Sequence, residues 1–288
     1  MMEHALTLML VHAHPDDETF ATGGTIGLYH ERGVRVVNVT CTGGEEGEIV
    51  DPELATPENY ADLSMIRQAE LQMADEILGV TDQEYLGYCD SGMDGRSSNA
   101  NPSCFHQATL DESTERLVRL IRHYHPQVLV TYDEKGSYGH PDHIKAHLIT
   151  VAAFEAAGNG SRYPETGVPW QPSKLYYVGQ PRQRMLEMWR ARQVQGEKTP
   201  LDNPDFDPNI RGIDDARMTT KLDVRPFVDN KIAALRAHRT QVKADNPIFR
   251  NDDLGRDYFG SEFFVLAQGK REQPTELETD LFAGIEGA

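Results

Sequence analysis

Hydrophobic residues in the first half of the chain fall into two kinds of run. Some runs are short and either continuously apolar or rich in β-branched residues, which is typical of strands buried on both faces of a sheet. These runs cover residues 6–11, 34–42, 84–88 and 127–132. The others repeat apolar residues at helical spacing and cover residues 22–32, 65–78 and 110–124. Because the two kinds alternate, the pattern predicts an α/β fold with a parallel sheet and right-handed crossovers.

The pattern becomes less regular after a helix expected over residues 144–157. Two stretches rich in Pro, Gly and Asp, residues 158–172 and 199–215, are typical of long surface connections. The remaining elements that the sequence predicts here are strands over 173–178 and 261–267 and helices over 182–195 and 227–241. We expect residues 158–288 to form a lobe that closes over residues 1–157, rather than an independent domain.

The charge balance narrows the class of partner. The 288 residues include 46 acidic and 28 basic side chains, and the formal net charge of -18 repels phosphate backbones and anionic lipid headgroups. No stretch approaches the roughly 20 apolar residues of a membrane span, and the apolar run near the start has no basic flank. The three cysteines show no CxxC spacing, which suits a reducing compartment. The sequence therefore predicts a soluble, cytoplasmic protein that binds neither nucleic acid nor membrane.

Histidine and carboxylate side chains crowd the ends of two expected strands. "HAHPDDE" (12–18) follows the first apolar run, and "TYDEKGSYGHPDH" (131–143) leaves the end of another. Parallel sheets bind ligands at the carboxyl ends of their strands, so the two motifs can meet in one crevice. Buried charges are costly unless they are paired, hydrogen-bonded or bound to a metal. A dinucleotide-binding dehydrogenase is excluded, because "HAHPDDE" stands where its GxGxxG loop would be.

We interpret the two motifs together as one metal site. His14, Asp17 and His143 would supply two imidazoles and one carboxylate with open positions, as in catalytic metal centres. Asp16 is the expected general base towards metal-bound water. The alternative is that each HPD sequence is an ordinary turn in which Asp caps a helix. His12, on the same side of the strand as His14, competes with it as a ligand but would lie deeper in the sheet.

Three further residues complete the expected chemistry. His140 would stabilise the oxyanion or protonate the leaving amine, and Tyr138 would offer its hydroxyl to the same oxyanion. Asp142 is expected to orient His140 or tune its pKa, as carboxylates near metal sites do.

The motifs resemble those of the PIG-L/LmbE-like family of metal-dependent N-deacetylases. "AHPDDE", followed over a hundred residues later by "HPDH", carries the resemblance, which extends through "TGGEEGEI", "DSGM", "PWQPSKLYY", "ALRAHRTQ" and "LFAGIE". They are most similar to the mycothiol branch, which contains the deacetylase that makes glucosaminyl-inositol and the amidase that cleaves mycothiol S-conjugates.

The resemblance implies a Rossmann-like sheet with helices on both faces over residues 1–157 and a smaller C-terminal lobe over 158–288. It implies one divalent cation, Zn²⁺ or Fe²⁺, and hydrolysis of an amide on the nitrogen of a small glucosaminyl thiol or glycoconjugate. It supports the ligands and catalytic groups named above. The family's sugar contacts suggest four substrate-binding residues: Arg67, Asp90, Glu46 and Glu48.

The resemblance leaves several alternatives open. "LFAGIE" and "TYDE" favour the conjugate amidase, whereas "YGHPDH" favours the deacetylase, and the lysine that follows "HPDDE" in the amidase is missing from "TFATGG". A bacillithiol precursor or another N-acetylglucosaminide is an alternative substrate, and a metal- or sugar-binding module without turnover is a less favoured reading. The acidic segment 43–63 has the length of a lid or of a solvated loop. Self-association into a homo-oligomer is also left open.

Overall fold

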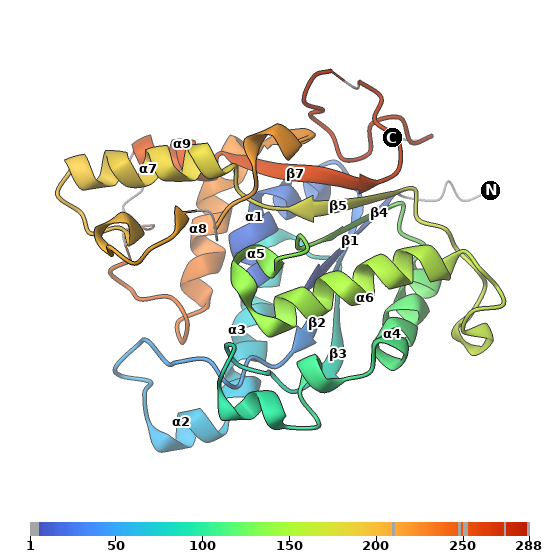
Figure 1. The fold of residues 1–288 in the computed structure, drawn as a ribbon, viewed down its shortest axis with the longest axis horizontal. Coiled ribbons are helices and arrows are strands. Elements are labelled where there is room, and N and C mark those ends of the chain that lie inside the picture. The colour runs from blue at the N-terminus through green and yellow to red at the C-terminus, as the bar shows by residue number, and fades with distance from the viewer. Residues whose placement is uncertain (1–5, 209–210, 247–248, 250–252, 274, 287–288) are drawn as a thin grey trace.

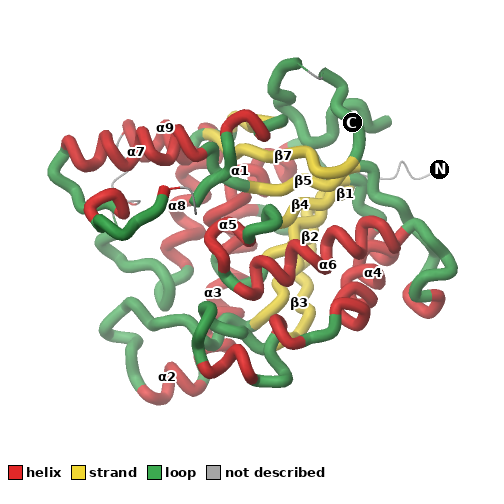
Figure 2. Tube along the Cα trace, in the orientation of Figure 1, coloured by secondary structure: helices red, strands yellow, loops and turns green. Residues whose placement is uncertain are grey.

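The computed structural model describes residues 6–208, 211–246, 249, 253–273 and 275–286. A sheet in the order β3-β2-β1-β4-β5-β7-β6 runs through these residues (Figures 1 and 2). Its strands are β1 (Thr7–His12), β2 (Arg35–Thr42), β3 (Asp82–Tyr88), β4 (Val128–Thr131), β5 (Lys174–Val178), β6 (Thr220–Asp223) and β7 (Ser261–Gln268). Strands β1 to β5 are parallel, and β7 is antiparallel to both β5 and β6. The expected α/β fold with a mostly parallel sheet is confirmed.

Helices cover both faces of the sheet, as Figure 1 shows. The α-helices of the described residues are α1 (Asp17–Glu31), α2 (Pro57–Ala61), α3 (Leu63–Leu78), α4 (Leu110–Tyr124), α5 (Gly136–Gly139), α6 (Pro141–Ala157), α7 (Arg182–Val194), α8 (Val228–Ala237) and α9 (Asp253–Phe259). Helices α4 and α6 pack together on one face, and α1, α3 and α8 pack together on the other.

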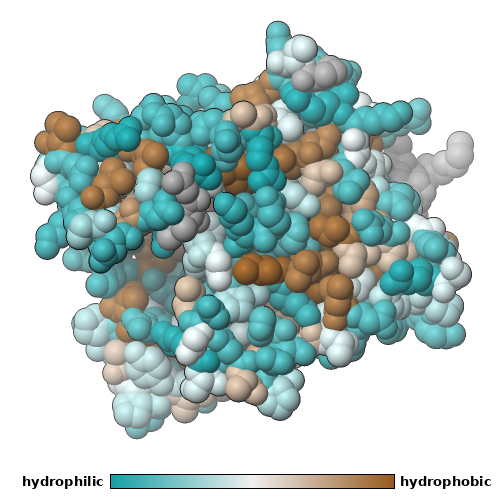
Figure 3. Space-filling view, viewed as in Figure 1, coloured by the Kyte–Doolittle hydropathy of each residue, from teal (hydrophilic) through white to brown (hydrophobic). Residues whose placement is uncertain are grey.

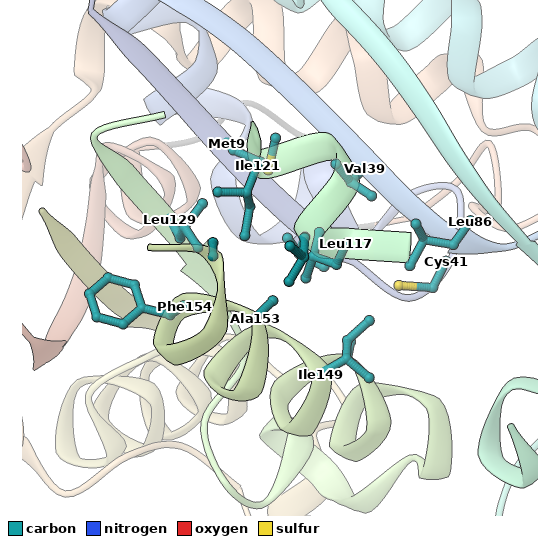
Figure 4. Packing of buried hydrophobic residues seen from close by; sticks show 14 of the residues in the cluster. Met9, Val39, Cys41, Leu86, Leu117, Ile121, Leu129, Ile149, Ala153 and Phe154 are labelled. Atoms are coloured by element: carbon teal, nitrogen blue, oxygen red, sulfur yellow. The ribbon is translucent and has the colours of Figure 1, made fainter. Parts of the chain in front are cut away.

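Alternate residues of the central strand supply two hydrophobic cores. Met9 and Val11 of β1 belong to the cluster beneath α4 and α6, part of which Figure 4 shows. Leu8 and Leu10 point to the other face and belong to the cluster beneath α1, α3 and α8. All four side chains are fully buried. A strand that is buried on both faces is therefore apolar at successive positions, as in "LMLV", residues 8–11.

The second core also takes in residues from the far end of the sequence. Leu281 and Phe282 are buried in the same cluster as Leu8 and Leu10. The Leu281 backbone N–H donates to the Tyr29 hydroxyl at 2.7 Å, and the rings of Tyr29 and Phe282 meet edge to face. Residues 281–282 are therefore part of the fold that β1 begins.

The observed elements differ from the expected ones mainly after residue 157. β6 and α9 were not predicted, because a four-residue strand and a seven-residue helix are too short to establish a hydrophobic period. The helix predicted over 227–241 ends at Ala237, and the residues after it turn inward. The connection 199–215 contains the buried Ile213, although residues 209–210 lie outside the described part of the chain. One sheet thus takes strands from both sides of position 157.

Hydrophilic residues dominate the face seen in Figure 3, in keeping with the net charge of -18. Among the residues that the structure describes, no helix combines the length and the hydropathy that crossing a membrane requires.

Candidate metal centre and active site

Strands β1 and β4 are neighbours in the sheet, and the loops that leave their carboxyl ends lie side by side. In the first loop β1 ends at His12 and α1 begins at Asp17, with Asp16 between them at a φ of 113°. The His14 backbone N–H donates to Asp17 Oδ2 at 2.9 Å, which closes the turn. A positive φ is uncommon outside glycine, so the surroundings of Asp16 must hold it there.

The second loop depends on two glycines. Gly136 has a φ of 59° and Gly139 a φ of 91°, which glycine adopts without strain. A Cβ on Gly136 would lie 2.7 Å from the backbone nitrogen of Ile144. Position 136 therefore has no room for a side chain. Helix α6 starts directly after His140, which places His143 in its first turn.

The two loops bring three metal-binding groups together. Asp17 Oδ2 lies 3.3 Å from His14 Nδ1 and 3.4 Å from His143 Nε2. Burial opposes ionisation of Asp17, but the two histidines outweigh it and hold the pKa of the carboxyl well below its usual range. Two buried imidazole nitrogens and one carboxylate oxygen around a common point are the donors that catalytic Zn²⁺ and Fe²⁺ centres use. The residues present therefore fit a divalent cation.

Two other groups of potential ligands share His14. Donor atoms of His14, His140 and His143 lie within 4.8 Å of one another, and so do those of His14, Asp90 and Asp142. The two carboxylates of the second group already accept hydrogen bonds from backbone N–H groups: Asp142 from Ser91 and Asp90 from Gly92, both at 2.8 Å. Asp17 Oδ2 also accepts a backbone hydrogen bond, but it faces nitrogens of two histidines, His14 and His143, whereas Asp90 and Asp142 face His14 alone. We therefore favour the carboxylate of Asp17 as the ligand.

The carboxylates of Asp90 and Asp142 face the other ring nitrogen of His14. His14 Nε2 lies 3.4 Å from Asp90 Oδ1 and 3.3 Å from Asp142 Oδ2. Burial lowers the pKa of His14, but these acids and Asp17 outweigh it and raise the pKa well above its usual value. A carboxylate on the far nitrogen is the usual way to fix the ring of a metal-binding histidine.

Asp142 was expected to orient His140 or tune its pKa. Its carboxylate makes no hydrogen bond to His140, but its charge does act on the pKa of His140, which it raises against the larger effect of burial. Both oxygens of Asp142 accept hydrogen bonds from Ser91, one from the backbone N–H and one from the hydroxyl, and Oδ2 also faces His14. Only the backbone N–H of Asp142 reaches His140, where it donates to Nδ1 at 3.2 Å. The first turn of α6 directs the carboxylate towards the segment after β3, which the HPD motif alone does not reveal. Ser91 stands within the quoted "DSGM", but nothing in its spacing pointed to Asp142.

Asp16 directly precedes Asp17, and hydrogen bonding of its backbone N–H fixes its position. Its N–H donates to Glu18 Oε2 at 3.0 Å, and one of its carboxylate oxygens lies 3.4 Å from Arg67 Nη2. Burial raises the pKa of Asp16 to about 6, against the opposing effect of Arg67.

Glu18 is supported from the distant segment after α8. His238 Nε2 lies 3.1 Å from Glu18 Oε1, and both side chains are fully buried. His238 and Glu18 are separated by 220 positions in the sequence. Sequence reasoning missed this pair, although His238 stands within "ALRAHRTQ".

His140 and Tyr138 lie next to the donor group. The ring of His140 is 4.5 Å from that of His14 and 5.3 Å from that of His143, and burial together with these neighbours lowers its pKa to about 4. The Tyr138 hydroxyl lies 3.5 Å from His143 Nε2, and its ring is partly exposed. Tyr132 was not predicted: its ring stacks on His143 at 4.1 Å, and its hydroxyl accepts from the Ala13 N–H.

The four expected sugar contacts divide into two pairs. Arg67 is 4% exposed and donates to the carbonyls of Pro15 at 2.5 Å and Gly44 at 2.7 Å, so it holds the loops. Asp90 is also buried, and one oxygen accepts from the Glu46 N–H at 3.3 Å.

The other two acids lie further out. Glu46 is half-buried, whereas the Glu48 side chain is 81% exposed and lies 3.7 Å from Arg96. The segment 43–63 that contains both is tied to the C-terminal part: the Val50 N–H donates to the Thr240 carbonyl at 2.8 Å, and Asp51 accepts from Arg239 at 2.6 Å.

His12 does not reach the donor group. It is fully buried, with Nε2 3.0 Å from the Thr22 hydroxyl and Nδ1 3.3 Å from the Tyr132 hydroxyl. Burial lowers its pKa. It is an internally hydrogen-bonded core histidine.

Residues 9–154 match the family model described as PIG-L, GlcNAc-PI de-N-acetylase. The matched segment contains all three proposed ligands and Asp16, and it covers half of the chain. The chain belongs to the PIG-L family.

PIG-L family relatives match over almost the whole chain. A 1D-myo-inositol 2-acetamido-2-deoxy-alpha-D-glucopyranoside deacetylase from Thermobispora bispora is 45% identical over 300 residues, covering 96% of this chain and 98% of the relative. A deacetylase of the same name from Streptomyces avermitilis is 42% identical over 286 residues, covering 96% of this chain and 97% of the relative.

Solved structures share the fold at lower identity. The N,N'-diacetylchitobiose deacetylase from Pyrococcus horikoshii is 19% identical, with a TM-score of 0.63 over 91% of this chain and 84% of that one. The 4-carboxy-2-hydroxymuconate hydratase GalB from Pseudomonas putida is 20% identical, with a TM-score of 0.61 over 94% and 100%. Because one of these is named a deacetylase and the other a hydratase, the fold of this PIG-L chain does not by itself define its reaction.

Proposed function

We propose that this protein is a metal-dependent hydrolase that removes the acetyl group from an N-acetylglucosaminyl-inositol. The observation that carries the proposal is the convergence of Asp17 Oδ2, His14 Nδ1 and His143 Nε2, with Asp16 in the same turn directly before Asp17. His14, Asp17 and His143 would hold one Zn²⁺ or Fe²⁺ ion. Such an ion, when bound, lowers the pKa of water and polarises the amide carbonyl.

Asp16 acts as the base in this proposal. Water adds to the amide carbon and loses a proton to the Asp16 carboxylate, and the carbon–nitrogen bond breaks as Asp16 passes that proton to the amine nitrogen. Acetic acid and the free glucosaminyl amine leave, the acid then gives its proton to solvent to become acetate, and Asp16 is again a carboxylate. Arg67 and Glu18 keep the base in position from either side.

His140 donates a hydrogen bond to the reacting oxygen. Its Nδ1 accepts from the Asp142 backbone N–H, so the neutral ring carries its proton on Nε2. A neutral imidazole is the form that the lowered pKa of His140 favours near pH 7. The Tyr138 hydroxyl, 3.5 Å from His143 Nε2, is available to the same oxygen.

The choice of substrate rests on the relatives. Relatives at 41–45% identity over nearly the whole chain carry the inositol-glycoside deacetylase name. Of the expected sugar contacts, Glu46 is half-buried and Glu48 is exposed in the same segment. The shared name of the relatives favours the deacetylase over the conjugate amidase.

Acetate release from N-acetylglucosaminyl-inositol tests the proposal, with enzyme loaded anaerobically with Fe²⁺ or with Zn²⁺. A mycothiol S-conjugate serves as the competing substrate. We expect acetate release, and expect the conjugate to turn over more slowly; the reverse preference would contradict the deacetylase assignment. His143→Ala should lose the metal by elemental analysis, whereas His123→Ala, at an exposed position of α4, should retain it.

A further inference from the structure

An apolar cavity of about 230 Å³ opens directly onto the proposed metal centre. Asp17, His143 and Tyr138 form part of its wall, so it is continuous with the site of reaction. The rest of the lining is mostly apolar and includes Phe20, Ala21, Val178, Met185 and Ile213.

The apolar wall is built largely by elements that follow residue 158. Val178 ends β5, Met185 lies in the first turns of α7, and Ile213 comes from the connection before β6. These three side chains are 5%, 6% and 4% exposed, respectively, so the wall is closely packed. Arg211 lies at its exposed rim, with the guanidinium 5.6 Å from the centre of the Tyr138 ring. A wall that is fixed by the core is suited to select a ligand by shape.

The side chains expected to contact the sugar lie elsewhere. Arg67, Asp90 and Glu46 are not part of the cavity lining. Asp90 faces His14 Nε2, whereas the cavity is lined by Asp17, which faces His14 Nδ1. The two ring nitrogens point in different directions, so polar and apolar surroundings lie on different sides of the donor group.

An N-acyl sugar is likewise polar on one side of its amide carbon and apolar on the other. The sugar carries hydroxyls that need hydrogen-bond partners, and the acyl chain carries none. We infer that the cavity receives the acyl side of the substrate and accepts straight-chain N-acyl groups longer than acetyl. A methyl group fills roughly the 30 Å³ of a water molecule, so about 230 Å³ leaves room for several more carbon atoms.

This inference rests on the proposed function, and a series of substrates tests the two separately. N-acetyl, N-propionyl, N-butyryl and N-hexanoyl derivatives of glucosaminyl-inositol are compared by release of the free amine. Each methylene withdrawn from water into the cavity raises kcat/KM by at most about fourfold. We expect kcat/KM for the N-butyryl substrate to equal or exceed that for N-acetyl. A lower value, with the N-acetyl substrate active, overturns the acyl cavity and leaves the proposed function intact.

A cavity-filling variant gives the matched comparison. Ala21→Leu on α1 adds three carbons at the cavity wall, and Ala69→Leu on the exposed face of α3 adds the same carbons elsewhere. The ratio of N-butyryl to N-acetyl kcat/KM should fall about tenfold in Ala21→Leu and stay at the wild-type value in Ala69→Leu. Equal ratios in the two variants overturn the inference.

A binding measurement tests the cavity even if the enzyme hydrolyses none of these substrates. If the metal-loaded enzyme releases amine from no member of the series, the proposed function is wrong. The cavity is then judged by calorimetric binding of hexanoate against acetate. Tighter binding of hexanoate supports an apolar ligand site, and equal or weaker binding overturns it.

Discussion

The parts of the molecule before and after position 157 contribute to the site in different ways. Before it, the proposed reacting groups stand in two compact motifs on the loops after β1 and β4. After it, single residues reach back over long distances in the sequence: His238 contacts Glu18, and Glu262 binds the backbone of α1 at Gly24. The chemistry is therefore local in the sequence, whereas the support for it is not.

Of the changes that test this comparison, removal of a reacting group before position 157 should have the largest effect, which is on kcat. Asp16→Asn keeps the size of the side chain and removes the base. We expect kcat to fall by about 10² to 10⁴, with the metal content unchanged, because that is the usual contribution of a positioned general base. Turnover within a few-fold of wild type would contradict the role of Asp16.

The support that residues after position 157 give to the fold should be measurable as free energy of unfolding. Lys231 Nζ donates to Glu262 Oε1 at 2.6 Å, and both side chains are almost completely buried. Glu262 also accepts from the N–H groups of Gly24 and Thr25. Lys231→Met leaves this carboxylate without its cation and should lower the free energy of unfolding by about 3–5 kcal/mol in urea titrations. Loss of less than about 1 kcal/mol would show that the pair adds little.

An exposed pair in the first part is the control for Lys231. Arg119 and Glu115 lie one turn apart on α4, 3.3 Å from each other, with side chains 55% and 41% exposed. Arg119→Met should cost less than about 1 kcal/mol, because water screens such pairs.

Asp75 is a buried carboxyl with no cation paired to it among the described ion pairs, whereas Glu262 is paired with Lys231. Burial and the charge of Glu18 raise the pKa of Asp75, on α3, to about 9. Between the ordinary value near 4 and about 9, the folded state holds a proton that the unfolded state has lost. The free energy of unfolding should therefore fall as pH rises through this window, by up to about 1.4 kcal/mol per unit.

The test of Asp75 is a pair of stability profiles between pH 5 and 8. Asp75→Asn keeps the shape and cannot titrate, so its profile should be flatter than that of the wild type and should lie highest relative to it at pH 8. Parallel profiles would mean that Asp75 does not hold the proton.

The smallest expected effect on catalysis separates a positioning role from a catalytic one. His238→Ala removes the partner of Glu18, which in turn holds the backbone N–H of Asp16. We expect kcat to fall about tenfold, with KM and metal content unchanged, and expect His238→Gln to recover part of the loss because its amide can donate to Glu18. Equal losses in both variants, in step with their thermal stability, would indicate a structural role alone.

The sequence allowed the prediction of the parallel sheet and of the meeting between "HAHPDDE" and "GHPDH". That prediction worked because both motifs follow apolar runs, and the carboxyl ends of parallel strands share one edge. The same reasoning did not reveal which way Asp142 points. The direction of its carboxylate depends on Ser91, which the fold brings close from the segment after β3. The catalytic roles of these residues remain predictions.

Contacts between distant residues account for the rest. Nothing in the spacing of "ALRAHRTQ" indicates that His238 meets Glu18, and the pattern instead predicted that the helix continues past it. The helix ends at Ala237, and Thr240 then donates to Glu70 through both its backbone N–H at 2.8 Å and its hydroxyl at 2.6 Å. These hydrogen bonds depend on how α8 packs against α3, which no local pattern contains.

The position of Leu281 and Phe282 in the same core as Leu8 and Leu10 has a consequence for synthesis of the protein in the cell. A ribosome adds roughly 5–20 residues per second, so on the order of 10–60 s separate the translation of these two groups. During that time the face of β1 that carries Leu8 and Leu10 lacks the side chains of Leu281 and Phe282 that complete its core. Its apolar residues are then available to chaperones, or to other nascent chains, until residues 281–282 have been made and have docked.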